Sequence, residues 1–464
     1  MNLTLSDFIK IRNAHLFGTD KLQRKICSGV STDSRKIENG NLFFALKGEN
    51  FDGHKFLNDV VKKNIYASVI NKDWFDAHKE ECENLNTTLI IVPNSTIAYG
   101  ELANIYRKKF SLPIIAIGGS NGKTTTKEMI REVLETKYNV LATIGNLNNH
   151  IGVPQMLFDL NQKHEIAILE LGTNHPGELK YLCEIVEPTH AVVTNIGREH
   201  LEFFKNLNGV MKEEKTIFDS VAEDGFAFVN SDDNYILKSI NNNKNKIFYG
   251  KKSSNNFIAS EININKDGNA SFKITNRETN KNQKVNLKIS GLHNVANALS
   301  SVAVGQTFGV SLKKCAEVLE NFSAPQKRME LISHKGITII NDSYNANPDS
   351  MLSALKTLES FQSKGRKIAV LGDMFELGSA SKTEHENIGL SINKMGIDFI
   401  FGVGKFTKRT ILNIRNKEAK YFFSKKELVK YLKKFVKKND VMLIKGSRGM
   451  KMEEVIDGIF SKGK

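Results

Sequence analysis

The chain has 464 residues, 40% of them hydrophobic, and carries 66 Lys and Arg against 51 Asp and Glu, a net charge of +15. This length predicts about three domains, and the composition is typical of a globular protein with hydrophobic cores. No run of about 20 apolar residues is present, which argues against a membrane span. The first residues also lack the basic and apolar segments of a secretion signal.

Cysteine usage and charge narrow the class of protein further. The four cysteines are widely spaced and form no Cys-x-x-Cys pair, so we expect free thiols in a reducing cytoplasm. The positive charge alone would suit a nucleic-acid-binding protein, but the lysines are spread widely and cluster only at 425–426 and 433–438. We therefore predict a solvated basic face that attracts anionic substrates, and no nucleic-acid partner.

Apolar strand patterns alternate with helical patterns, which predicts an α/β protein with domains over residues 1–110, 111–323 and 324–464. The predicted elements, in chain order, are strands 42–46 and 64–71, helix 94–109, a strand ending at 118, helix 123–135, strands 139–143, 165–172, 189–196 and 257–264, a helix opening near 294, and strands 337–341, 367–371, 398–403 and 440–445. Residues 242–289 are rich in Asn, Lys and Ser, and we expect part of this stretch to be a mobile insertion.

Polar turns flank the first predicted strand. Ser31-Thr-Asp-Ser-Arg35 precedes it, and Gly48-Glu-Asn-Phe-Asp-Gly-His54 follows it. The hydroxyl groups and Arg35 suit a diphosphate, and backbone groups near Ala45 and Gly48 suit the edge of a uracil. Such turns are common in proteins, so the pattern alone indicates this ligand only weakly.

The most informative stretch, residues 112–126, places a strand, a glycine loop and a helix in succession. This order points backbone N–H groups and a helix N-terminus at a phosphate, whereas a plain glycine turn would not need Lys-Thr at the helix start. Lys123 can reach the β- and γ-phosphates of a nucleotide, and the Thr124 hydroxyl can hold Mg²⁺. The predicted phosphate loop comprises Gly119, Ser120, Asn121, Gly122, Lys123, Thr124 and Thr125.

Two further polar residues follow strands of the central domain. Glu170 lies near the end of a buried strand and His200 lies past the end of the next one, at the sheet edge where ligands bind in open α/β sheets. From the residues alone, Glu170 is either an Mg²⁺ ligand or a half-exposed strand-end side chain. A lone histidine is more often structural than a ligand, so His200 is undecided on the same grounds.

These motifs together resemble the Mur ligases, which add amino acids to the peptidoglycan precursor. Folylpolyglutamate synthases have a similar Gly-Ser-Asn-Gly-Lys-Thr-Thr loop, but they lack the N-terminal pattern that runs from Ser31 to His54. That pattern resembles the uridine-nucleotide domain of Mur ligases. The resemblance implies a UDP-precursor-binding domain, then a P-loop ATPase-like domain that binds ATP, then a Rossmann-like ligase domain.

The resemblance also implies roles for particular residues. The UDP-precursor would be bound by Ser31, Asp33, Ser34, Arg35, Phe44, Ala45, Gly48, Asp52 and His54. The loop beside the reacting groups would supply Asn146, Asn148 and Asn149, with Asn174 following the strand that ends in Glu170. Adenine and the rest of ATP would contact Asn294, Asn297, Arg328 and Asp342, and the incoming amine would meet Tyr344, Asn345 and Asn347. Glu170 and His200 become Mg²⁺ ligands under this interpretation.

The implied activity is the ATP-dependent addition of D-alanyl-D-alanine to a UDP-N-acetylmuramoyl tripeptide by a monomeric enzyme. Asp342-Ser-Tyr-Asn-Ala-Asn-Pro348 and Glu170-Leu-Gly-Thr-Asn174 favour the branch of the family that adds this dipeptide. The tripeptide carboxylate would attack the γ-phosphorus to form an acyl phosphate, which the dipeptide amine then attacks. Two alternatives are a sibling ligase that adds the third-position diamino acid and, more remotely, a P-loop ATPase stimulated by nucleic acid.

One position departs from the family. Many Mur ligases carry a carbamylated lysine that helps to hold a second Mg²⁺, and this position falls on Glu214 here, between Lys212 and Lys215. A lysine carbamate is in effect a longer carboxylate, so we predict that Glu214 supplies the charge without modification. The alternative is a shift in register that gives the role to Lys212 or Lys215.

Overall fold

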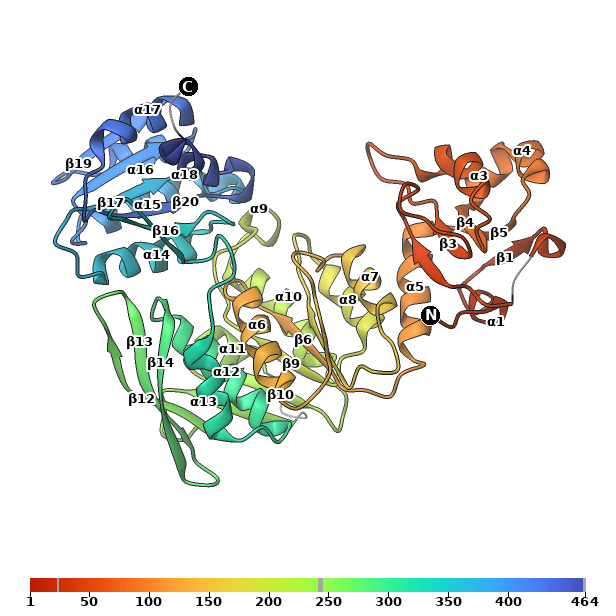
Figure 1. Ribbon diagram of the computed structural model, residues 1–464, viewed down its shortest axis with the longest axis horizontal. Coiled ribbons are helices and arrows are strands. Elements are labelled where there is room, and N and C mark those ends of the chain that lie inside the picture. The colour runs from red at the N-terminus through yellow and green to blue at the C-terminus, as the bar shows by residue number, and fades with distance from the viewer. Residues whose placement is uncertain (23–24, 241–244, 462–464) are drawn as a thin grey trace. The chain divides into compact units, whose positions relative to one another are not determined.

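The computed structural model describes residues 1–22, 25–240 and 245–461 (Figure 1). The chain divides into two compact units. The first consists of Met1–Ala116, Tyr138–Thr173 and Glu178–Thr189, and the second of Ile117–Lys137, Asn174–Gly177 and His190–Lys464. The described strands of the chain form sheets of five, nine and six strands, and helices connect many of the successive strands, so the predicted α/β class is confirmed.

The N-terminal sheet has the order β1-β5-β4-β3-β2. Its strands are β1 (His15–Phe17), β2 (Gly29–Ser31), β3 (Asn41–Phe44), β4 (Ala67–Asn71) and β5 (Thr88–Val92), parallel except for β1. All of β5 is buried, as expected for a parallel strand covered on both faces. Helix α5 (Ser95–Arg107) begins where the Asn94 side chain accepts two backbone N–H groups, so this predicted helix is confirmed.

The central sheet has the order β14-β13-β12-β11-β10-β9-β6-β8-β7. Its strands are β6 (Ile114–Gly118), β7 (Val140–Ala142), β8 (Ile166–Glu170), β9 (His190–Val193), β10 (Phe226–Asn230), β11 (Asn245–Gly250), β12 (Phe257–Ile264), β13 (Asn269–Asn276) and β14 (Lys281–Ser290). The pairs β7–β8, β9–β10, β10–β11 and β11–β12 are parallel, and β12, β13 and β14 continue antiparallel.

The expected mobile insertion is largely part of this sheet. Residues 241–244 lie outside the described residues, but β11 to β14 account for most of the stretch that follows. In β14 the buried side chains Val285, Leu287 and Ile289 alternate with exposed polar ones. The polar residues that suggested mobility are therefore the outer face of an amphipathic strand.

The C-terminal sheet has the order β15-β16-β20-β17-β18-β19. Its strands are β15 (Glu330–His334), β16 (Ile337–Asp342), β17 (Lys367–Leu371), β18 (Phe399–Val403), β19 (Glu418–Phe422) and β20 (Val441–Lys445), parallel except for β15. The four strands predicted here are confirmed. The sequence analysis missed the two edge strands, because β15 has the short, only partly buried sequence Glu-Leu-Ile-Ser-His and β19 has the mixed sequence Glu-Ala-Lys-Tyr-Phe.

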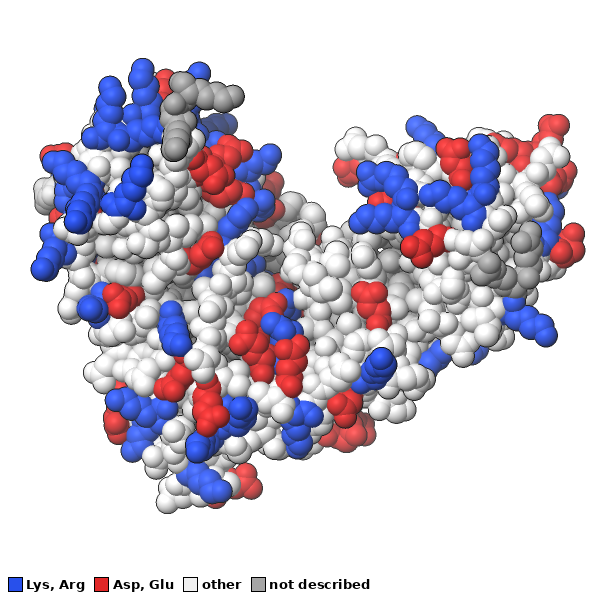
Figure 2. Space-filling view, in the orientation of Figure 1, with Lys and Arg blue, Asp and Glu red and all other residues white. Residues whose placement is uncertain are grey.

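The positive charge is more concentrated in one segment of the chain than the sequence analysis predicted. Residues 405–438 contain thirteen Lys and Arg but only two Glu, a net +11 of the total +15. This segment includes helices α16 (Thr407–Leu412) and α17 (Lys425–Phe435), and Figure 2 shows Lys and Arg gathered where these helices lie. Within the described residues, no helix is long and apolar enough to cross a bilayer.

The aromatic core of the C-terminal sheet allows a matched test of burial. Phe401 is 2% exposed and its ring lies 5.1 Å from Phe435 and 5.4 Å from Tyr431, whereas Phe423 is 81% exposed. We expect Phe401→Ala to lower the free energy of unfolding by about 3–5 kcal/mol, because it leaves a cavity. Phe423→Ala should change it by less than about 0.5 kcal/mol. Urea titrations followed by circular dichroism would measure both, and equal midpoints would contradict this core assignment.

Candidate active site

The predicted phosphate loop joins β6 to helix α6 (Lys123–Glu135), which begins at the residue the sequence predicted. Gly119 and Gly122 have φ values of 108° and 83°, in the left-handed region. A Cβ atom at Gly119 would lie 2.3 Å from Oγ1 of Thr194. Both the conformation and the close approach therefore require glycine in this loop.

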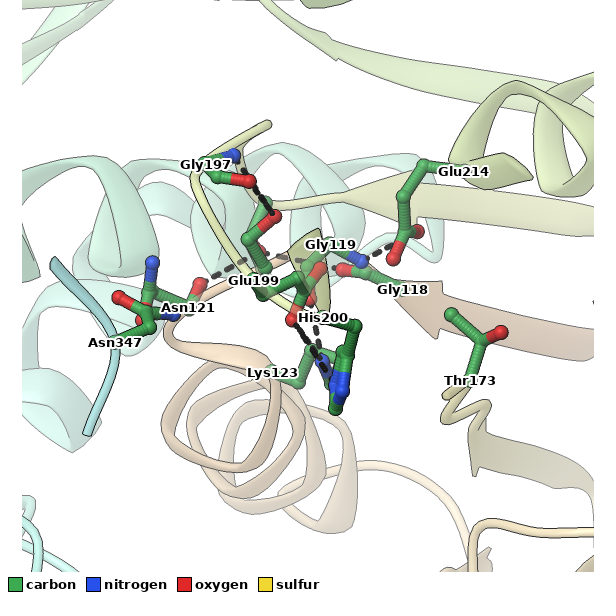
Figure 3. Close-up of polar contacts among 12 residues, drawn as sticks. Gly118, Gly119, Asn121, Lys123, Thr173, Gly197, Glu199, His200, Glu214 and Asn347 are labelled. Atoms are coloured by element: carbon green, nitrogen blue, oxygen red, sulfur yellow. Dashed lines mark hydrogen bonds and ion pairs between the residues drawn. The ribbon is translucent and has the colours of Figure 1, made fainter. Parts of the chain in front are cut away.

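The segment that follows β9 holds the loop in place. The Ser120 N–H donates to the Asn195 carbonyl at 2.8 Å, and the Asn195 side-chain amide donates to the Asn121 carbonyl at 2.7 Å. The Gly197 N–H donates to the Ser120 hydroxyl at 2.8 Å (Figure 3). Two strand-end segments are thus bonded together at the loop.

The N-terminus of α6 has the geometry of a phosphate site. The first α-helical bond after the loop runs from the Thr126 N–H to the Gly122 carbonyl. Helix geometry therefore gives the N–H groups of Lys123, Thr124 and Thr125 no acceptor within the helix, and this is the arrangement that binds phosphate.

Lys123 lies among carboxylate and carbonyl oxygens. Its Nζ donates to the Gly119 carbonyl at 2.6 Å and lies 3.8 Å from Oε2 of Glu199. The same Glu199 oxygen lies 3.9 Å from Nε2 of His200 (Figure 3). The structure thus brings together the predicted Lys123 and His200, with Glu199, which the sequence analysis did not predict, between them.

Glu214 contacts the phosphate loop from helix α10 (Leu207–Asp219). Its Oε2 accepts the Gly119 N–H at 2.7 Å, and its side chain is almost completely buried. Burial, and then the charge of Glu199, raise the pKa of Glu214 to about 8. Two carboxylates therefore lie close to each other in a poorly solvated place.

The donor set fits a hard divalent cation. Oε1 of Glu214 and Oε1 of Glu199 are both buried, and neither has a hydrogen-bond partner within the described part of the chain. Buried oxygens without partners are rare, and carboxylate oxygen is the ligand that Mg²⁺ prefers. The described residues contain no group of three or more His, Cys, Asp or Glu placed to hold a metal.

The register of α10 distinguishes Glu214 from its neighbours. Lys212 is exposed, and Lys215 pairs with Asp219 at 2.5 Å on the surface of the helix. The other buried acid, Glu213, accepts the Gly177 N–H at 2.8 Å. The structure therefore places Glu214 at the phosphate loop, and neither lysine of the alternative register there.

Glu170 is the last residue of β8 and is buried. The Asn148 amide donates to its Oε1 at 2.9 Å, and its N–H donates to the Thr143 hydroxyl at 2.9 Å. The Asn149 side chain accepts the Gly152 N–H at 2.8 Å, beside the start of helix α7 (Gly152–Phe158). Of this predicted loop, Asn148 thus contacts the predicted metal ligand, Asn149 is structural, and Asn146, like the separate Asn174, is exposed.

Two predicted substrate residues of the N-terminal domain pair with each other. Arg35 donates two side-chain hydrogen bonds to Asp33, at 2.9 and 2.8 Å, and it lowers the pKa of Asp33 to about 2. The Ser31 hydroxyl donates to the Asp33 carbonyl at 3.1 Å. Arg35 is 86% exposed and Ser34 is partly exposed, so this turn presents its polar groups to solvent.

His54 has a structural position instead. Its ring is fully buried, with Nδ1 2.5 Å from the Asp52 carboxylate and Nε2 accepting the Asn71 N–H at 3.0 Å. A ring nitrogen that accepts an N–H carries no proton, so the ring is neutral, and burial lowers its pKa.

Among the other predicted precursor-binding residues near His54, two are buried in the core and one is exposed to solvent. Phe44 and Ala45 are buried, and the Ala45 N–H and carbonyl are bonded to Val69 and Ser95. Gly48 is exposed. Much of the segment from Phe44 to His54 thus contributes to the packing and the hydrogen bonds of its own loops.

The predicted adenine residues open helix α12 (Asn294–Thr307) and are both buried. The Asn297 amide donates to the Asn294 side chain at 2.9 Å, and the Asn294 amide donates to the Ser290 carbonyl at 2.8 Å. A Cβ atom on Gly122 would lie 2.8 Å from Oδ1 of Asn297. Asn297 therefore adjoins the phosphate loop itself.

The predicted C-terminal nucleotide contacts form two separate pairs. The Arg328 guanidinium lies 3.9 Å from the centre of the Tyr344 ring. Lys445, which is 2% exposed, donates to Asp342 at 2.5 Å and to the Asn345 carbonyl at 2.9 Å. The sequence analysis placed Lys445 only at the end of a predicted strand and assigned it no role.

Four side-chain pairs described here join the C-terminal segment to the phosphate-loop region. The Asn347 amide donates to Oδ1 of Asn121 at 2.9 Å. Arg198 donates to Asp349, from Nη2 at 2.5 Å, and to Glu384, from Nη1 at 2.8 Å. Nδ1 of His200 lies 2.7 Å from the Glu376 carboxylate.

The sequence analysis missed Arg198, Glu199 and Glu376. Arg198 and Glu199 lie in the Thr194–His200 segment after β9, so their place past a strand end was the available signal. Their partners come from elements far along the chain, and one sequence does not reveal such pairs.

The chain matches the sequence signatures of three domains in order. The Mur ligase family, catalytic domain matches residues 27–107, the Mur ligase middle domain 117–305, and the Mur ligase, glutamate ligase domain 327–448. A UDP-N-acetylmuramoyl-tripeptide--D-alanyl-D-alanine ligase of Bacillus subtilis is 34% identical over 439 residues, 94% of this chain and 93% of the relative.

Solved structures agree over the same length. A crystal structure of MurF from Acinetobacter baumannii is 30% identical, covers 100% of this chain and 99% of its own, and has a TM-score of 0.90. MurF ligase from Thermotoga maritima in complex with ADP is 27% identical, covers 95% of this chain and 98% of its own, and has a TM-score of 0.81. On full-length similarity in sequence and fold, the chain belongs to the Mur ligase family.

Proposed function

We infer that this Mur ligase joins D-alanyl-D-alanine to a UDP-N-acetylmuramoyl tripeptide with ATP. The observation that carries this function is Lys123 at the start of α6, beside two buried carboxylates, in a chain whose full-length relatives catalyse that reaction. A sibling diaminopimelate ligase is only 16% identical with a TM-score of 0.56, so its likeness indicates the fold alone. The dipeptide ligase is therefore favoured over the sibling.

We propose that residues 1–110 bind the UDP-precursor, 111–323 bind ATP and 324–464 receive the incoming amine. Precursor binding is assigned to the exposed polar turn around Arg35 and to the loop that His54 shapes. The amine site is assigned to Tyr344, Asn345 and Asn347, of which Asn347 bonds to the phosphate loop. The four buried thiols suit a cytoplasmic enzyme, and we propose that it acts as a monomer.

ATP binding is assigned to the phosphate loop, with adenine beside Asn297 and Asn294. Backbone N–H groups at the start of α6 would bind the phosphates, and Lys123 would follow the charge on the transferring phosphoryl group. Arg328 and Asp342 would meet the nucleotide from the C-terminal segment. The contact of Asn297 with Gly122 supports this arrangement.

We propose that Mg²⁺ takes its protein ligands from Thr124, Glu170, His200 and Glu214, although the described structure does not gather the three His and Glu side chains of this set around one point. The unpaired buried oxygen of Glu214 supports its assignment in place of the family's carbamylated lysine. A bound Mg²⁺ would supply electrostatic stabilisation of the phosphate charge. Because Mg²⁺ keeps several waters, this set need not surround it completely.

The chemistry follows in two displacements. A carboxylate oxygen of the tripeptide attacks the γ-phosphorus, ADP leaves, and an acyl phosphate forms. The dipeptide amine then attacks the acyl carbon, inorganic phosphate leaves, and a proton is lost from the nitrogen to give the amide. Lys123 and the helix N–H groups stabilise the negative charge that would otherwise keep the two anionic reactants apart.

Lys123→Ala should reduce ligation by about 10²-fold or more, because it removes the cation that follows the transferring charge. Phosphate release with UDP-precursor and D-alanyl-D-alanine would measure this, with a melting curve to verify folding. Lys212→Ala, on the exposed face of α10, is the control and should stay within about twofold of the parent. Ligation by Lys123→Ala within tenfold of the parent would refute the assignment.

Glu214→Gln should abolish most ligation and also change the pH dependence of stability. A folded pKa near 8, above the ordinary 4.5, means that the native protein retains a proton the unfolded chain has lost. The stability from that proton is complete below about pH 4.5 and disappears as pH rises through about 8. Without metal, the melting temperature of Glu214→Gln relative to the parent should therefore rise from pH 5 to pH 8. A difference in melting temperature that does not change with pH, or full ligation activity of Glu214→Gln, would contradict the role assigned to Glu214.

Arg198→Lys tests the contacts between the phosphate-loop region and the C-terminal segment. Lysine cannot bond to Asp349 and Glu384 in the same geometry, so we expect kcat/KM for ATP to fall about tenfold. Arg366→Lys is a matched control, because Arg366 forms a bidentate pair with Asp440 and is also 25% exposed. It should keep kcat/KM within about twofold. Equal kinetics for the two variants would show that Arg198 only stabilises the fold.

A further inference from the structure

Glu199 is a deeply buried acid beside the phosphate loop to which the Mur ligase motifs assign no role. It precedes His200 in the segment after β9 and is 6% exposed. Its Oε2 lies 3.8 Å from Nζ of Lys123, while its Oε1 is buried without a hydrogen-bond partner among the described residues.

A second orphaned oxygen lies nearby. Glu214 is 1% exposed, and its Oε1 likewise has no partner in the described part of the chain. The two acids come from different elements, the β9 segment and α10, and both reach the phosphate loop (Figure 3). Glu214 accepts the Gly119 N–H at 2.7 Å, and the Gly119 carbonyl accepts from Lys123, whose Nζ lies 3.8 Å from Glu199, so both acids lie beside the same glycine of the loop.

Lys123 cannot neutralise this pair throughout the reaction. In the structure its Nζ contacts the Gly119 carbonyl and Glu199. In the proposed function Lys123 turns to the phosphates, and Glu199 then loses its contact with this lysine and keeps only His200 nearby, at 3.9 Å. Carboxylates buried in this way are stable only when they are paired or bind a metal.

We propose that Glu199 is an oxygen ligand of a divalent cation, Mg²⁺, which binds between Glu199 and Glu214 beside the phosphate loop. This inference rests on the proposed function, because the cation accompanies ATP, and it adds a ligand from this chain's own sequence. Mg²⁺ prefers oxygen ligands and keeps several waters, so the Glu199 carboxylate would add to the ligands proposed above without having to surround the ion. The cation then takes the place of Lys123 at the Glu199 carboxylate when Lys123 turns to the phosphates.

Mn²⁺ is the probe, titrated into the nucleotide-free full-length protein while the free ion is followed by electron paramagnetic resonance. Glu199→Gln and Glu214→Gln should each weaken Mn²⁺ binding by about tenfold or more, because each removes a charged ligand. Glu213→Gln is the matched control, since that neighbouring buried acid accepts the Gly177 N–H, and it should bind Mn²⁺ within about twofold of the parent. Glu199→Asp keeps the charge and should recover part of the Mn²⁺ affinity. This variant also keeps the test valid if Glu199→Gln does not fold.

Unchanged Mn²⁺ affinity in Glu199→Gln, or no Mn²⁺ binding by the parent, would overturn the proposal. Unchanged Mn²⁺ affinity with tighter binding of a non-hydrolysable ATP analogue would show that Glu199 only restrains Lys123. Ligation by the parent is measured separately with UDP-precursor and dipeptide. A parent that ligates while Glu199→Gln binds Mn²⁺ normally refutes this inference alone, whereas a parent that does not ligate refutes the proposed function.

Discussion

The burial of negative charge beneath the phosphate loop is the constraint on which the rest of the site depends. Glu214 accepts the Gly119 N–H, so the loop's left-handed turn and the position of α10 are determined together. A carboxylate in this position loses its hydration, and one backbone N–H and the nearby Lys123 compensate only in part, because the pKa of Glu214 remains raised to about 8. The loop is therefore organised around buried acidic groups whose negative charge only a cation can balance.

The segment after β9 connects this loop to the rest of the second unit. Asn195 and Gly197 bond to the loop, while Arg198 and His200 contact acids from the C-terminal sheet. Different residues of one short segment thus contact two partners, the phosphate loop and acidic residues of the C-terminal part of the chain. A displacement of the C-terminal loops would shift Asn121 and Ser120, because only a few hydrogen bonds separate these two residues from the C-terminal loops.

Local patterns made much of the fold and the phosphate loop predictable. The apolar run before Gly118 and the Lys-Thr start of α6 predicted both elements, because strand burial and helix termini follow rules that a single sequence displays. The structural duties of His54 and Asn149 were not predictable in this way, since their partners are backbone groups positioned by the fold. Glu199 and Arg198 were missed for a related reason: their importance lies in contacts with Lys123, Asp349 and Glu384.

The contacts made by Arg198 and Asn347 have a thermodynamic consequence. They join the phosphate loop to the segment proposed to receive the amine, so a ligand that alters these contacts at one place would change the free energy of binding at the other. Such coupling is reciprocal: the factor by which nucleotide binding tightens the hold on the dipeptide must equal the factor by which the dipeptide tightens the hold on the nucleotide. The order in which the two ligands bind can then vary without changing the total affinity of the loaded enzyme, and each ligand acts as an effector of the other.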